Sequence, residues 1–376
     1  MWKQTFFRKL DLSLMALIAA LMVISLLVIS STTSILFDGE WDGFFTPHVK
    51  KQLQYYGVGW ASFFFLSWFN YHKLREWTWI LYVGMIVLLI GLFFAPAIQS
   101  VHRWYRIGGV AFQPSEYAKL VVVLILSWFL ERKRDKSREW KTTFQALALL
   151  FTPFALILKQ PDLGTALVLF PIGLGLFYFG EINRKALWVM GSLVLIGFTT
   201  ISLFFLSIVD HEEFRPIATK VIKEYQYERL TPKTYHQQAA KTAIALGGVW
   251  GKGWRKSEFT RRQWLPAAHT DSVFPAFAEE FGLMGVLALL ALFFGVIARC
   301  FYVSMMAQDS FGRLLAAGIA IYLGMHMVMN LGMMCGLLPI TGVPLVMISY
   351  GGSSIVATMS ALGVVQGIYT RRFLFS

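Results

Sequence analysis

The chain has 376 residues, of which 56% are hydrophobic, 16% aromatic and only 15% charged, and its mean hydropathy is +0.58. Soluble domains carry about 25% charged residues, so this composition excludes an ordinary soluble enzyme. A formal net charge of +13 in so apolar a chain indicates basic loops facing anionic lipid or phosphate, and we expect no nucleic-acid partner.

The apolar residues run in blocks, and a bilayer core needs about 20 of them per helical span. They predict an all-α polytopic membrane protein with about ten transmembrane helices, of which the second and sixth are short. The expected spans, in chain order, are Leu12–Leu36, Gly57–Phe69, Trp77–Phe94, Ser115–Leu130, Thr142–Leu158, Thr165–Phe179, Ala186–Ile208, Phe277–Val303, Leu314–Met334 and Val346–Tyr369.

Lysine and arginine gather in the short connections on one side, notably at 132–141 and 184–185. This bias predicts that these connections and both termini are cytoplasmic. The long segment 210–274, between the seventh and eighth helices, is then an extracytoplasmic loop within one integral membrane domain, 1–376. Helical periodicity at Lys220–Tyr227 and Lys233–Leu246 predicts helices on the membrane surface.

Polar, glycine and proline clusters fall on four outward-facing connections, which predicts one site open to the outer leaflet. In the first cluster, Glu116 and Lys119 share a helix face at i,i+3. They either form a structural ion pair or also shape a substrate cavity. Arg103 is either an interface anchor or a phosphate ligand.

The second cluster runs from Lys159 to Ala166. Asp162 fits the N-cap of the next helix, and Lys159 is placed to pair with it or to bind a phosphate. In the third cluster, Asp271 follows His269 directly before the eighth span. An aspartate there is either an N-cap or a catalytic carboxylate.

The third cluster also contains Gly247–Gly253, a glycine-rich stretch that lacks the spacing of a nucleotide-binding P-loop. Its Lys252 is either a solvated cation or a ligand for a lipid diphosphate. The fourth cluster, Gly336–Ser354, has a Gly-Gly pair beside Ser353 and predicts a broken or closely packed helix entry.

In this order the four clusters resemble the SEDS family (shape, elongation, division, sporulation) of bacterial cell-wall membrane proteins, and its RodA branch more than its FtsW branch. The resemblance covers almost the whole chain. The matching runs are Arg103-Trp104, Gln113–Glu116 with Lys119, Gln160–Ala166, Ala268–Asp271, Glu279-Glu280 with Gly282, and Gly336–Ser354. Ala267, Ser272 and Val346 depart from residues common in the family.

The resemblance implies a ten-span peptidoglycan glycosyltransferase that polymerises lipid II in the bacterial inner membrane, with a class B penicillin-binding protein as partner. Asp271 matches the family's essential aspartate and is the candidate general base. We expect the substrate-binding residues to be Arg103, Glu116, Lys119, Lys159, Asp162, Lys252, His269 and Ser353.

The chemistry is consistent with this assignment, because transfer from a diphosphate needs one base and positive charge for the leaving group. A divalent cation, Mg²⁺ or Mn²⁺, is a candidate cofactor, but we expect no metal ligands among the residues. Two other functions stay open: a lipid II flippase, and a non-catalytic scaffold for a penicillin-binding protein.

Overall fold

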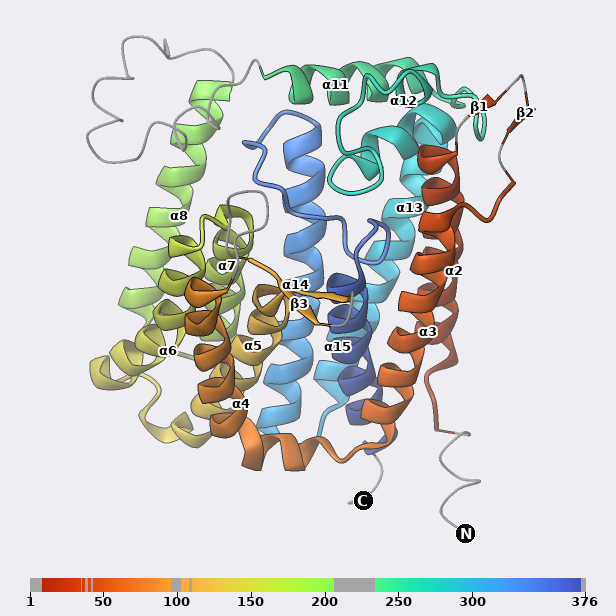
Figure 1. The fold of residues 1–376 in the computed structure, drawn as a ribbon. Coiled ribbons are helices and arrows are strands. Elements are labelled where there is room, and N and C mark those ends of the chain that lie inside the picture. The colour runs from red at the N-terminus through yellow and green to blue at the C-terminus, as the bar shows by residue number, and fades with distance from the viewer. Residues whose placement is uncertain are drawn as a thin grey trace.

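The computed structural model describes residues 9–34, 36–37, 40–41, 43–95, 103–107, 110–205 and 234–372. Long helices form a bundle, with two shorter helices across one end and two small antiparallel hairpins at its side (Figure 1). The described part of the predicted loop is 234–274. The rest of it, with the expected helix Lys220–Tyr227, lies outside the described residues.

The long helices are α2 (Leu12–Thr33), α3 (Pro47–Trp68), α4 (Tyr71–Gly91), α5 (Pro114–Arg132), α6 (Trp140–Lys159), α7 (Leu163–Phe179), α8 (Arg184–Phe205), α13 (Val273–Met306), α14 (Ser310–Met334) and α15 (Gly352–Thr370). The shorter elements are α11 (Tyr235–Gly247), α12 (Glu258–Arg261), the 3₁₀ turns Leu92–Phe94 and Arg134–Lys136, and strands β1 (Leu36–Phe37), β2 (Glu40–Trp41), β3 (Tyr105–Ile107) and β4 (Val110–Phe112).

Among the described residues, six helices are long and apolar enough to cross a membrane: α2, α4 with its 3₁₀ extension, α6, α13, α14 and α15. Helices α14 and α15 are the most buried of the six. Helix α14 packs against α5, α7, α13 and α15, while α15 packs along α3. Close approach requires glycine here, since a Cβ on Gly363 would lie 2.6 Å from the carbonyl oxygen of Phe63.

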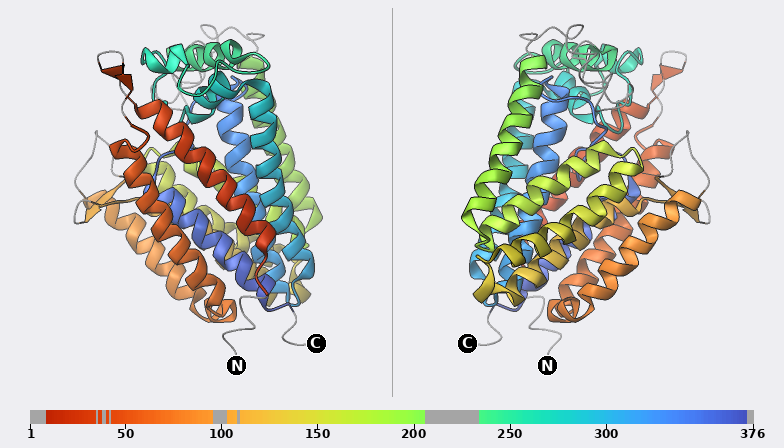
Figure 2. Two further views of the ribbon diagram at one scale, coloured as in Figure 1. Left: turned by 90° about the vertical axis from the view of Figure 1, so that its right-hand side faces the viewer. Right: turned by 90° about the vertical axis from the view of Figure 1, so that its left-hand side faces the viewer.

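The two ends of the bundle differ. We call the end where α2 begins and α15 ends the terminal end. The opposite end, where α11 and α12 lie, is the loop end (Figure 2). At the terminal end, Asp11 caps α2 and pairs with Arg299 of α13 at 2.5 Å. Helix α13 therefore begins at the loop end and returns the chain to the terminal end.

Three expected boundaries are wrong by six residues or more. Helix α4 begins at Tyr71 rather than at Trp77, because Asn70 caps a polar first turn. Helix α3 begins at Pro47, ten residues before the expected Gly57, because Thr46 caps a polar first stretch that an apolar-run criterion excludes. Helix α15 begins at Gly352 rather than at Val346. The preceding segment is non-helical and contains two prolines, and Gly336 and Gly342 there have positive φ.

The glycine-rich stretch after α11 docks on α13 through its backbone. The N–H groups of Lys252 and Gly253 donate to the carbonyls of Glu279 and Glu280, each at 2.9 Å. A Cβ at Gly251 would lie 2.1 Å from the carbonyl oxygen of Glu280, so only glycine fits. Gly251 therefore serves close packing at the loop end.

Glu279 and Glu280 are both occupied by this docking. Glu279 accepts hydrogen bonds from the Ser257 hydroxyl and, at 3.1 Å, from the N–H of Phe259. Glu280 accepts from the Ser31 hydroxyl and, at 3.0 Å, from the N–H of Arg255. The two carboxylates thus fasten the loop to α13 and α2, and the loop delivers the chain to Asp271.

Candidate active site

Asp271 lies in a turn, Ala267–Ser272, directly before α13. Helix α14 and the segment that joins it to α15 fix the backbone of this turn. The Asn330 side chain of α14 donates to the carbonyl of Asp271 at 3.0 Å and to that of Val343 at 2.8 Å. The Ser349 hydroxyl donates to the carbonyl of Thr270 at 2.6 Å. The hydrogen bonds from Asn330 and Ser349 together hold the turn of Asp271 against the segment that joins α14 to α15.

The Asp271 carboxylate is half-buried beside Gly342, where a Cβ would lie 3.4 Å from its Oδ2. Burial raises the pKa of Asp271, the negative charge of Asp162 raises it further, and the positive charge of Arg103 opposes both. The three side chains, which come from three of the four sequence clusters, therefore share one electrostatic environment. A carboxylate with a raised pKa is a stronger base.

Asp162 caps α7 and also joins the first cluster to the second. Its Oδ1 accepts from the N–H of Thr165 at 3.4 Å, which confirms the predicted N-cap. Its Oδ2 accepts from the Ser115 hydroxyl at 3.0 Å and from the Gln113 amide at 3.3 Å. These bonds bring the start of α5 to the start of α7.

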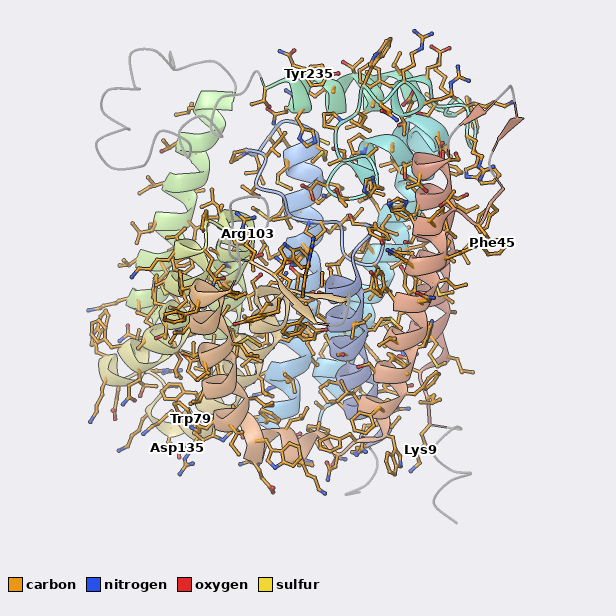
Figure 3. The ribbon with its side chains drawn as sticks, viewed as in Figure 1. Lys9, Phe45, Trp79, Arg103, Asp135 and Tyr235 are labelled. Atoms are coloured by element: carbon orange, nitrogen blue, oxygen red, sulfur yellow. The ribbon has the colours of Figure 1, made fainter. Side chains whose placement is uncertain are left out.

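Arg103 and Ser353 make two further connections. Arg103 donates to the backbone carbonyls of Gln160 and Pro161 in the turn between α6 and α7, beside which Figure 3 shows it. Ser353, at the start of α15, accepts from the N–H of Gln113 at 3.1 Å and donates to the carbonyl of Ala111 at 3.2 Å. The first, second and fourth clusters are therefore in direct contact.

Glu116 and Lys119 form the predicted ion pair, at 2.7 Å, and both side chains are buried. The Lys119 Nζ also lies 2.7 Å from Nε2 of His326, whose Nδ1 is 3.4 Å from the carbonyl oxygen of Pro344. An ammonium has only protons to offer, so Nε2 accepts and the ring N–H is at Nδ1. This series of hydrogen bonds connects α5, through His326 of α14, to the segment beside Asp271.

Three expected ligands lie apart from this cluster. Lys159 is exposed at the end of α6, and Lys252 is exposed on the glycine-rich stretch. His269 is near in sequence, but its ring packs on His48 and Tyr350, with ring centroids 5.3 and 6.0 Å away. Their substrate-binding roles stay predictions.

Two residues of the site were missed in the sequence. His326 and Asn330, at i,i+4, share the face of α14 that is turned to the segment 342–344. A signal was available, since a histidine and an asparagine inside an apolar span are costly and usually functional. Both residues were missed because the span was identified from its run of apolar residues alone.

Within the described part of the chain, no three His, Cys, Asp or Glu side chains gather as a ligand set for a metal ion. Mg²⁺ is commonly held by one or two carboxylates together with substrate phosphates. Asp271 and Asp162 are neighbouring carboxylates, since the charge of Asp162 raises the pKa of Asp271, and they have the ligand chemistry that such an ion uses.

Comparison with known proteins places this arrangement in a family. The model of the FtsW/RodA/SpoVE family, described as "Cell cycle protein", matches residues 11–372. The chain is 33% identical to the peptidoglycan glycosyltransferase MrdB of Escherichia coli K12, over all of this chain and 98% of that protein. It is 32% identical to the probable peptidoglycan glycosyltransferase FtsW of Geobacter metallireducens, over 96% of this chain and 95% of the relative.

Solved structures agree. The rod shape determining protein RodA of Thermus thermophilus superposes with a TM-score of 0.70 and 28% identity, over 97% of this chain and 98% of that one. A chain of a structure described as "Structural coordination of polymerization and crosslinking by a peptidoglycan synthase complex" gives a TM-score of 0.75, with the same identity and coverage. The protein is thus a multi-pass membrane protein, and it belongs to the FtsW/RodA/SpoVE family, the SEDS family that the sequence resembles.

Proposed function

We propose that this protein is a peptidoglycan glycosyltransferase of the rod-shape type, which polymerises lipid II, with Asp271 as its general base. Of the relatives named above, one is a peptidoglycan glycosyltransferase and one a probable peptidoglycan glycosyltransferase, and the similarity covers 98% and 95% of their lengths. The observation that carries the catalytic assignment is the half-buried Asp271 carboxylate with a raised pKa, at the point where the four polar clusters meet.

We propose that the bundle spans the membrane ten times as one domain, through the six apolar helices and through α3, α5, α7 and α8, which lie in the same bundle. The terminal end carries the basic connections and therefore faces the cytoplasm of a bacterial inner membrane. The loop between α8 and α13 then faces outward, where the donor must be lipid-linked because nucleotide sugars are absent.

In the proposed reaction a hydroxyl of one sugar attacks the anomeric carbon of another that is joined to a prenyl diphosphate. The new glycosidic C–O bond forms, and the bond to the diphosphate breaks with its electron pair. The hydroxyl proton passes to Asp271. Inversion needs no carboxylate nucleophile, so Asp162, occupied by Ser115 and Gln113, has an orienting and electrostatic role.

The leaving diphosphate requires positive charge. Arg103 is the described cation whose charge acts on Asp271, because it lowers the pKa of that carboxylate. We propose that a divalent cation, Mg²⁺ or Mn²⁺, would be held by the diphosphate together with Asp162, whose Oδ1 accepts, among the described residues, only the N–H of Thr165, and would supply the remaining charge. Lys119 is enclosed by Glu116 and His326, so we assign it to positioning the site.

The partner we propose is a class B penicillin-binding protein, because one structural neighbour belongs to a complex whose description joins polymerization with crosslinking. The deciding experiment supplies lipid II to the protein purified with that partner and compares wild type with Asp271→Ala. Polymer from wild type alone supports the transferase. Lipid transfer between leaflets without polymer would favour the flippase, and polymer formed equally by both proteins would exclude Asp271 as the base.

A further inference from the structure

A polar cavity lies beside the turn that carries Asp271. It measures about 540 Å³ and lies between the end of α2, the start of α3 and the loop segment 255–269. Ala267, Ala268 and His269 of the turn line it, and His48 of α3 faces them. The cavity thus begins two residues before the proposed base, and its volume is within the range of small-molecule sites.

The hydroxyl groups at the end of α2 determine which ligand atoms this cavity favours. The Thr32 and Thr33 hydroxyls donate to the backbone carbonyls of Val28 and Ile29, and Ser31 donates to Glu280. The Thr33 hydroxyl also lies 2.7 Å from that of Thr46, which then donates to it. A hydroxyl has one proton and two lone pairs. Each of these hydroxyls therefore has at least one lone pair left with which to accept a hydrogen bond from a ligand.

One cation on the cavity wall, Arg255, is engaged by groups of the protein itself. The Arg255 guanidinium donates to the Ser30 hydroxyl at 2.8 Å and to the Gly43 carbonyl at 3.2 Å, and the backbone N–H of Arg255 bonds to Glu280. Burial and the neighbouring His48 lower the pKa of His269, so its imidazole is neutral at neutral pH. Arg261 and Gln263 supply donors at the exposed rim.

Acceptor hydroxyls, donors at the rim, the neutral imidazole of His269 and an apolar wall at Pro266–Ala268 together match a pyranose ring. Such a ring carries many hydroxyls around an apolar C–H face. We propose that this cavity is a glycan subsite, which holds a sugar unit next to the one that reacts at Asp271. The assignment rests on the proposed function, and it goes further by naming Arg261 and Gln263 as residues that bind carbohydrate.

Two sugars fit this chemistry: one in the growing strand, or one in the incoming lipid-linked substrate. Arg261→Ala removes a charged donor at the rim, and Arg262→Ala is the matched control. Arg262 is the adjacent exposed arginine, which instead lies 4.0 Å from Glu258 and over the ring of Trp264. If the subsite holds the strand, Arg261→Ala shortens the polymer with little change in KM. If it holds the incoming substrate, KM rises and polymer length changes little.

Binding is measured first and without turnover, by titrating the detergent-purified full chain with soluble, uncrosslinked peptidoglycan glycan fragments. We expect Arg261→Ala to bind about ten-fold more weakly, as for loss of a hydrogen bond from a charged group. We expect Gln263→Ala to bind several-fold more weakly and Arg262→Ala to match wild type. Equal binding by wild type, Arg261→Ala and Arg262→Ala, or no binding by wild type, would overturn the subsite. Glycan binding without polymerisation would instead overturn the proposed function.

Discussion

Two carboxylates of this protein, Asp271 and Glu116, differ in how deeply they are buried and in whether they form an ion pair. Glu116 is 3% exposed and pairs with the fully buried Lys119 within the bundle. Asp271 is half-buried beside Gly342, with a raised pKa and no ion pair with another described side chain. A buried charge with a close partner holds structure, whereas a carboxylate that keeps its lone pairs available can accept a substrate proton.

The comparison is tested most strongly at Asp271 itself. We expect Asp271→Asn to lower the polymerisation rate about 10²- to 10⁴-fold, the usual range for a general base. The melting temperature should not fall, since the amide keeps the shape and no ion pair is lost. The measurements are lipid II polymerisation and thermal unfolding in detergent. Asp135→Asn, on an exposed turn at the terminal end, is the control, and a comparable rate loss there would discredit the assignment.

The buried pair should show the reverse pattern. Lys119→Met leaves Glu116 charged and unpaired, so we expect a loss of about 3–5 kcal/mol in the free energy of unfolding. The double variant Lys119→Met with Glu116→Gln should recover most of it, because no buried charge remains.

Denaturant unfolding in detergent measures both variants. The matched control is Arg138→Met, which breaks the exposed pair of Arg138 with Glu181, 3.5 Å apart, and should cost less than about 1 kcal/mol. Equal losses for Lys119→Met and Arg138→Met would show that burial gives the inner pair no special weight.

A smaller effect is expected where the bundle holds Asp271 in place. Asn330→Ala removes the hydrogen bonds to the carbonyls of Asp271 and Val343. We expect kcat to fall about ten-fold with little change in KM, because orientation of the base is lost and the substrate contacts remain. Asn183→Ala, which removes a bond to the Arg138 carbonyl at the terminal end, is the control. A change in KM alone would reassign Asn330 to binding.

The smallest effects are shifts in the pH dependence of kcat/KM. Asp271 must be ionised to act as base, so activity falls as the pH drops through its pKa. The Arg103 charge lowers this pKa and the Asp162 charge raises it. Arg103→Ala should therefore move the acid limb to higher pH, and Asp162→Asn, which keeps an N-cap side chain, to lower pH. Shifts in the same direction would contradict this electrostatic account.

Much of the site was predictable where the interactions are local. The N-cap by Asp162 spans three residues, and the pair of Glu116 with Lys119 is one helical turn apart. Both follow from spacing alone. The start of α3 was not predictable from apolar runs, because Thr46 and Pro47 begin a helix whose first turns are polar.

The sequence by itself determined the apolar helices, the local caps and pairs, and the family, since these depend on residues close together in the chain or on motif order. The tertiary structure decided which charges are enclosed and which stay accessible. Lys119 acquires His326 from 207 residues away, and Ser353 reaches the N–H of Gln113 across 240 residues. Only packing brings such distant groups together, because burial and long-range hydrogen bonds are set by the whole bundle and not by any one segment.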